Sequence, residues 1–148
     1  MSQPVEIDPR GHRFNAVLTS VVIAAAIVAL GVAPALAIAL TAFQLAVFAI
    51  GGFHRLTASP YALAYARAVR PRIGPPRQLE DAAGPVFSQV LGTFFLAAGL
   101  AALVTGATTV GYIALALALF AALLNASIGL CLGCELHLIL QRLRTPKA

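Results

Sequence analysis

Two cysteines three residues apart are the residues of this chain best suited to chemistry. Cys131 and Cys134 are its only cysteines, and they form a C-x-x-C motif that is followed directly by Glu135. A pair with this spacing, in surroundings that favour a thiolate, typically carries out thiol–disulfide exchange. In this interpretation Cys131 attacks, Cys134 resolves the mixed disulfide, and the Glu135 carboxylate accepts a proton. These three residues are the predicted catalytic site.

The same motif has two other interpretations. Two thiolates supply half of a tetrahedral zinc shell. His137, one turn after Cys134, is a candidate third ligand, and a second copy of the chain would complete the ligand set. Cysteine also packs readily as a small apolar residue, and the protein is then a membrane scaffold or assembly subunit. The sequence leaves these alternatives open. It identifies no metal ligands with certainty, predicts no cofactor and does not decide whether the protein is an enzyme.

The elements that must position this motif are membrane helices. The chain is 60% hydrophobic and only 10% charged, and its mean hydropathy is +0.91, values that are typical of an integral membrane protein. A membrane span needs about 20 apolar residues in a row, and its backbone must satisfy its own hydrogen bonds, which favours helices. Four runs without any charged residue meet this length: Phe14 to Val32, Ala35 to Phe53, Val86 to Thr105, and Thr108 to Leu130. We expect an all-α protein with four transmembrane helices in one membrane domain over residues 1–148.

The distribution of basic residues predicts how the helices are oriented. All Lys and Arg residues lie before the first run, between the second and third, or after the fourth: Arg10, Arg13, Arg55, Arg67, Arg70, Arg72, Arg77, Arg142, Arg144 and Lys147. Since basic residues near spans stay in the cytoplasm, both termini and the middle segment should be cytoplasmic. The net charge of +5 then indicates attraction to anionic lipid headgroups and not to nucleic acid. A dithiol on this side is normally kept reduced, which argues against a structural disulfide.

The two halves of the chain resemble each other. The segment from Asp8 to Phe14 reads D-P-R-G-H-R-F, and the segment from Asp81 to Phe87 reads D-A-A-G-P-V-F. We therefore predict two helical hairpins that point the same way, a parallel internal repeat, over about residues 8–72 and 81–144.

Each hairpin should be followed by a short helix at the cytoplasmic interface. The first begins at Ser59-Pro60, a helix-start signal, and is expected to run to Val69. The residue before Pro71 is disfavoured in helical angles, and Gly74-Pro75-Pro76 should end the element. In the second copy Cys131 takes the place of Ser59 as the N-cap. The alternative is one unbroken helix from Thr108 to Leu143, and we favour the broken form because glycines flank the motif.

Polar residues elsewhere give weaker signals. Gln44, Gln89, Asn125 and Ser127 lie in or at the ends of the spans. Such residues can line a substrate path, but hydrogen bonding between helices is their commoner role and is the one we expect. The spans lack the intramembrane charges of ion-coupled pumps. His12 and His54 flank spans and receive no role.

Several of these motifs together resemble a known family. The ordered set I-D-P-R-G-x-R-F at Ile7 to Phe14, S-P-Y at Ser59, R-P-R-I-G-P-P at Arg70 and C-L-G-C-E at Cys131 is similar to the bacterial membrane family called domain of unknown function 4395. It is more distantly similar to DoxX-like four-helix membrane proteins, several of which are associated with thiol or sulfur redox systems. The resemblance implies a bacterial inner membrane, and it points to Cys131, Cys134 and Glu135 as functional residues.

These observations predict a multi-pass inner-membrane protein whose cytoplasm-facing dithiol exchanges electrons or sulfur with a soluble partner. A thioredoxin-like protein or a sulfurtransferase has the matching chemistry. The lipid bilayer and a second copy of the chain are the other expected partners.

Overall fold

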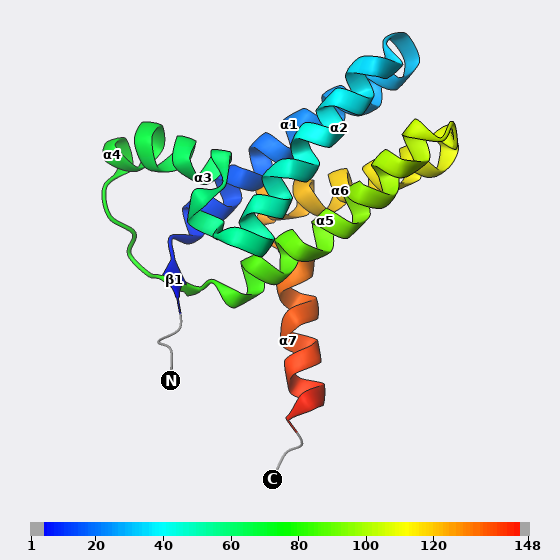
Figure 1. Cartoon of the computed structure of the whole chain (residues 1–148). Helices are drawn as coiled ribbons and strands as arrows, with labels where there is room; N and C mark the ends of the chain where they lie inside the picture. The colour runs from blue at the N-terminus through cyan, green and yellow to red at the C-terminus, as the bar shows by residue number, and fades with distance from the viewer. Residues whose placement is uncertain (1–4, 146–148) are drawn as a thin grey trace.

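The fold is a bundle of four long helices. The computed structural model describes residues 5–145 (Figure 1). Its long helices are α1 (Pro9–Val32), α2 (Pro34–Ala49), which continues through a π-helical turn η1 (Ile50–His54), α5 (Ala83–Val104) and α6 (Thr108–Ile128). All four are long and apolar enough to cross a membrane. The predicted all-α membrane fold is therefore confirmed, with spans that agree with the sequence to within a few residues.

The four helices form a closed ring. Helix α1 packs against α2 and α6, while α5 packs against the same two helices from the opposite side. Small residues such as Ala26 allow close contact, and the centre is filled by Ile23, Leu96, Leu103 and Leu115. The two ends of this ring differ, and the cysteine motif lies at one of them.

The two ends of the bundle differ in charge. Ala33 alone separates α1 from α2, and residues 105–107 separate α5 from α6. In Figure 1 both of these turns lie at the upper right, whereas the middle segment and α7 lie at the opposite end, which we call the base. The described Arg residues lie at the start of α1, in the middle segment between His54 and Glu80, and in the last turn of α7, all of which are at the base. Lys147 lies outside the described residues.

The middle segment is more helical than predicted. It contains a 3-10 turn η2 (Leu56–Ala58), α3 (Pro60–Ala64), a π-helical turn η3 (Tyr65–Val69) and α4 (Arg70–Ile73). The prediction that this helix stops at Val69, before Pro71, is wrong. The wide π turn precedes Pro71, which occupies the first turn of α4, where a missing N–H group costs nothing. Gly74 ends the segment, as predicted, with a φ of 72°.

The starts of the two halves of the chain meet at the base. Strand β1 (Glu6–Ile7) pairs with β2 (Glu80–Asp81) in an antiparallel ladder. Asp8 accepts a hydrogen bond from the backbone N–H of Arg10 at 3.0 Å, and Asp81 accepts one from the N–H of Ala83 at 2.9 Å. The matching D-x-x-G segments thus make the same local turn, and the internal repeat itself stays a prediction.

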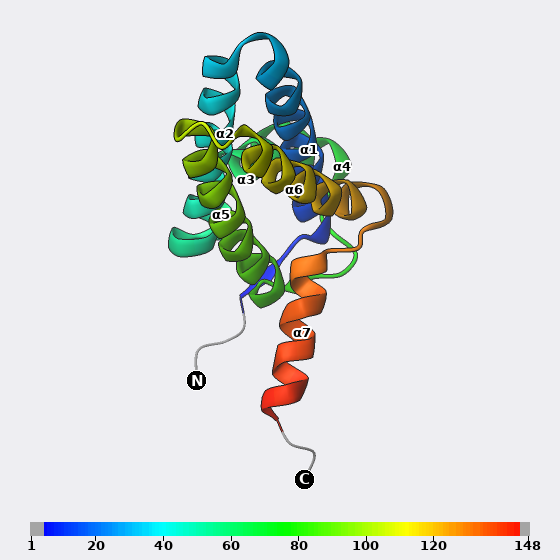
Figure 2. The same cartoon turned by 90° about the vertical axis from the view of Figure 1, so that its right-hand side faces the viewer.

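The last helix is separate from the fourth span. Gly129 ends α6 in the left-handed conformation, with a φ of 73°, and α7 (Leu132–Arg144) begins three residues later. The broken form of this segment is therefore the observed one. Helix α7 packs against α5 at its start and then projects away from the bundle in both views (Figures 1 and 2). Its position along a membrane surface stays a prediction.

Candidate functional site

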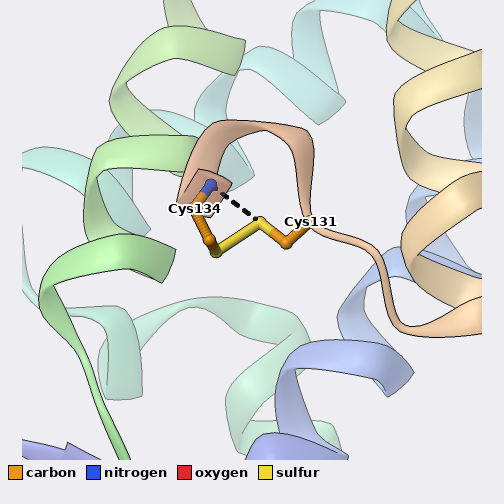
Figure 3. The surroundings of a disulfide bond; sticks show 2 residues. All are labelled: Cys131 and Cys134. Atoms are coloured by element: carbon orange, nitrogen blue, oxygen red, sulfur yellow. Dashed lines mark hydrogen bonds between the residues drawn. A yellow bond between two sulfur atoms is a disulfide. The ribbon is translucent and has the colours of Figure 1, made fainter. Parts of the chain in front are cut away.

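The two cysteines lie at the first turn of α7. Cys131 is the N-cap, as its alignment with Ser59 predicts, and its sulfur accepts a hydrogen bond from the backbone N–H of Cys134 at 3.3 Å (Figure 3). This turn brings the two Cα atoms to 5.2 Å, and the sulfurs are joined as a disulfide. The structure differs here from the expected reduced pair. Two cysteines with this geometry can form a disulfide with each other, and the structure shows the pair in this oxidised form.

Glycines let the motif pack tightly against α5. A Cβ atom added to Gly133 would lie 2.7 Å from the Cα atom of Ser88, and one added to Gly84 would lie 3.3 Å from the Cβ atom of Cys134. Real Cβ atoms do not approach backbone atoms as closely as the first of these distances. The glycine inside C-x-x-C therefore allows α7 to cross α5 at the site.

Arg13 fixes the turn that leads into the motif. Its guanidinium donates hydrogen bonds to the backbone carbonyls of Ala126 at 3.2 Å and Ser127 at 3.1 Å. These carbonyls belong to the last turn of α6, where the helix has no internal partners for them. The start of α1 is thereby tied to the end of α6, immediately before Cys131.

His12 completes a cluster that sequence reasoning missed. One ring nitrogen of His12 and the sulfurs of Cys131 and Cys134 all lie within 4.8 Å of one another. Both ring nitrogens are buried and have no hydrogen-bond partner among the described residues. No local spacing links His12 to the cysteines, because the contact depends on how α1 and α7 meet. The only available signal was that both flank spans at the end where the basic residues lie.

His137 and Glu135 lie elsewhere. The His137 ring stacks against Phe87 with centroids 5.3 Å apart, and its Nε2 atom lies 3.0 Å from the amide nitrogen of Gln141. His12, and not His137, is therefore the histidine beside the sulfurs. The side chain of Glu135 is exposed in the first turn of α7 and is not part of the cluster. Its backbone N–H closes that turn on the carbonyl of Cys131 at 3.0 Å.

The cluster borders a cavity inside the bundle. This cavity has a volume of about 440 Å³ and lies between α1, α5, α6 and α7. Its polar side chains are grouped near the motif, with His12, Asn15, Asn125 and Cys131 among them, while its remaining lining is mostly apolar. Cys131 lines the cavity and is buried, whereas Cys134 is half-buried. We call it the dithiol cavity.

A chain of hydrogen bonds reaches the dithiol cavity from α3. The Tyr61 hydroxyl donates to Gln44 at 2.7 Å, the Gln44 amide donates to Thr19 at 3.1 Å, and the Thr19 hydroxyl donates to the Asn15 oxygen at 3.4 Å. Burial raises the pKa of Tyr61 to about 12, so Tyr61 stays a donor. Gln44 makes the interhelical hydrogen bonds predicted for it, and Gln89 and Asn125 line the cavity. The prediction is wrong for Ser127, whose hydroxyl donates to the Leu123 carbonyl within α6 at 2.6 Å.

A second cavity lies on the other side of His12. It has a volume of about 230 Å³ and is lined by residues of the base that include Asp8, Tyr65 and Arg70. Asp8 accepts from Tyr65 at 2.8 Å and forms an ion pair with Arg10 at 3.0 Å. Although burial opposes it, the hydrogen bonds from Arg10 and Tyr65 hold the pKa of Asp8 below its usual value of 3.8. Burial and the bond to Asp8 raise the pKa of Tyr65.

Comparison with known proteins identifies the family and no more. The family model described as domain of unknown function (DUF4395) matches residues 7–142, almost the whole chain. The chain belongs to this family. No match is found among curated proteins or among solved structures. The DUF4395 match covers the cysteine motif and His12 alike, and it assigns no activity to them, so a function has to be argued from the site.

Proposed function

We propose that this DUF4395 protein is a membrane-bound thiol–disulfide exchange protein whose reacting group is the Cys131–Cys134 pair. The observation that carries the proposal is the closed pair at the start of α7, with a histidine beside both sulfurs. A scaffold needs neither the unpartnered His12 ring nor a cavity at the motif. The exchange partner is a soluble thioredoxin-like protein, or a sulfurtransferase where sulfur is transferred in place of electrons.

The site is proposed to face the cytoplasm of a bacterial cell. Four apolar helices support a multi-pass membrane protein. The described Arg residues all lie in segments at the base, which the positive-inside rule assigns to the cytoplasmic side. The motif lies at the same end. A soluble partner can therefore approach the motif from the cytoplasm, through the side on which Cys134 is partly exposed, to reach Cys131.

The exchange runs through a mixed disulfide. In the reduced protein the Cys131 thiolate is favoured by the N–H group of Cys134 and by the helix N-terminus. It attacks a partner disulfide and releases one partner thiolate. Cys134 then loses its proton to His12 and attacks the Cys131 sulfur. The second partner thiolate leaves, so the partner gains two electrons and the Cys131–Cys134 bond forms. Every step is reversible, and a reduced partner opens the bond by the reverse sequence.

Two single-cysteine variants test this function. Purified, reduced Cys134→Ser and Cys131→Ser proteins are mixed with dipyridyl disulfide, and the release of thiopyridone is followed against pH. The Cys134→Ser protein should react at least about tenfold faster near neutral pH, because it keeps the stabilised thiolate. In cells it should also accumulate a mixed disulfide that a non-reducing gel resolves. Because Cys131 is buried, the reagent reaches its sulfur less easily. If the Cys131→Ser protein reacted faster, Cys134 would be the attacking cysteine and Cys131 the resolving one. Equal reaction rates in the two proteins, with ordinary thiol ionisation in both, would contradict the proposed function and favour a scaffold.

A metal site is the second candidate, and His12 is the observation that favours it. One imidazole and two thiolates within 4.8 Å supply the nitrogen and sulfur ligands that zinc prefers, with one position open. Protein purified under reducing conditions should then carry about one zinc ion per chain, and His12→Ala should lose it. Elemental analysis measures this directly. The exchange function predicts no stoichiometric metal in either protein.

A further inference from the structure

The dithiol cavity extends from the base into the apolar part of the bundle. Along α6 its lining runs from Asn125 to Leu117, a distance of about 12 Å at 1.5 Å per residue. At its far end Phe95, Leu117 and Phe120 line the cavity and also have exposed side chains on the outer surface of spanning helices. The cavity therefore has a side that faces lipid. An apolar molecule dissolved in the bilayer can enter it without passing through water.

The wall of the cavity restricts what its occupant can be. One end presents Cys131 and the unpartnered His12 ring, and the other end is lined by aromatic and aliphatic side chains. Asn15 lies at the polar end with its oxygen already engaged by Thr19, which leaves its N–H groups to donate. A suitable occupant is lipid-soluble, carries hydrogen-bond acceptors at one end and accepts electrons in pairs. The volume of about 440 Å³ lies within the range of small-molecule sites.

We propose that the dithiol cavity binds a quinone and that the reduced Cys131–Cys134 pair transfers two electrons to it. This inference rests on the proposed thiol–disulfide function and names the electron acceptor. Two S–H bonds break and one S–S bond forms between the cysteines. The quinone carbonyl oxygens gain the two electrons and two protons and become the hydroxyl groups of a hydroquinone. A soluble dithiol then reduces the pair again, so electrons pass from the cytoplasm into the membrane.

His12 is positioned to transfer protons from the thiols to the quinone. It lies beside both sulfurs, and it lines both the dithiol cavity and the second cavity at the base. In this mechanism it accepts a proton from a thiol and donates it to the nearer quinone oxygen.

The test uses the full chain in detergent with decylubiquinone as the probe. The ring of this benzoquinone carries no hydrogen, so thiols cannot add to it and only electron transfer is observed. Reduced protein is mixed with the probe without oxygen, and quinone absorbance and free thiols are measured together. We expect one quinone reduced for each pair of thiols lost.

Ala121→Trp, which fills the cavity from α6, should slow quinone reduction at least tenfold, and Ala118→Phe should act in the same direction. The control Ala101→Trp adds the same bulk to an exposed position of α5 that does not line the cavity, and it should behave as wild type.

A second measurement separates the two proposals. Reduction of the oxidised pair by dithiothreitol needs no cavity, so all of these variants should show the wild-type rate if they are folded. His12→Gln should slow quinone reduction more than it slows this exchange. Wild-type rates of quinone reduction in both cavity variants would overturn the quinone inference and leave thiol exchange in place. A pair that reacts with neither reagent would remove the proposed function, and the quinone inference with it.

Discussion

Gly133 of α7 lies directly on the backbone of Ser88 in α5, with space for a hydrogen atom and none for a methyl group. Gly133→Ala should therefore force the two helices apart at the cysteine motif. We expect a loss of about 1–3 kcal/mol in unfolding free energy, the usual cost of overpacking a tight contact. Thermal or denaturant unfolding in detergent measures this loss. The separation should also make the reduced cysteines react faster with an alkylating reagent.

Gly31 offers the matched control for this substitution. It lies near the end of α1, and a Cβ atom added there meets nothing within 4 Å. Gly31→Ala should leave stability unchanged or raise it by up to about 1 kcal/mol, because alanine favours the helix. If Gly133→Ala were as stable as Gly31→Ala, α7 would not be seated on α5 as described.

Tyr61 connects the middle segment to the interior of the bundle. Its hydroxyl donates to Gln44, whose side chain is fully buried in α2. Tyr61→Phe leaves the Gln44 oxygen without this donor and should cost about 0.6 kcal/mol, the average for hydrogen bonds between membrane helices, and at most about 1.7 kcal/mol. Tyr112→Phe serves as the control, because Tyr112 is exposed on α6. Equal unfolding midpoints for the two variants would show that the chain from Tyr61 to Asn15 contributes no stability.

Asp8 should make the stability of the fold depend on pH. Its pKa is lowered in the folded protein by hydrogen bonds from Arg10 and Tyr65, which outweigh the effect of burial. A lowered pKa means that the unfolded chain binds more protons than the folded one in the acid range. The stabilisation is therefore fully present above the usual value of 3.8 and is lost as the pH falls through the folded value. Unfolding midpoints measured from neutral to acid pH should decrease in wild type and decrease less in Asp8→Asn.

Asp81→Asn is the control for this pH profile. Asparagine keeps the helix-start hydrogen bond at either position. The Asp8–Arg10 pair is the one salt bridge among the described residues, so Asp81 has no comparable partner there. The Asp81→Asn protein should keep the wild-type pH dependence. Identical profiles for both variants would place the acid-sensitive group elsewhere.

Local signals in the sequence predicted the spans and the caps. The apolar runs of α1, α2, α5 and α6 must be helical because lipid offers no other partner for their backbone groups. Cys131 could be placed at a helix start because it aligns with Ser59, and the structure has it as the N-cap. The first inference needs only residues that are close together in the chain, and the second needs only a comparison of the two halves of the sequence.

Contacts between segments that are far apart in the chain could not be predicted from the sequence. His12 reaches the cysteines because α1 and α7 meet at the base, and no pattern near His12 differs from that of an ordinary residue beside a membrane. The helical conformation at Pro71 depends on the π turn before it, which no propensity indicates. The dithiol cavity likewise arises from the packing of four helices, so neither its volume nor its lining could be read from one of them.

The orientation proposed for the bundle predicts which positions can be labelled from outside the cell. Ala33 forms the turn between α1 and α2, and Thr108 begins α6 after the other uncharged turn. In a background without Cys131 and Cys134, Ala33→Cys and Thr108→Cys should react with an impermeant maleimide added to intact cells. Thr145→Cys, at the end of α7, should react only after the cells are permeabilised, because basic residues hold that end inside. Reaction of Thr145→Cys in intact cells would place the cysteine motif outside the cytoplasm, where a thioredoxin-like partner of the cytosol could not reach it.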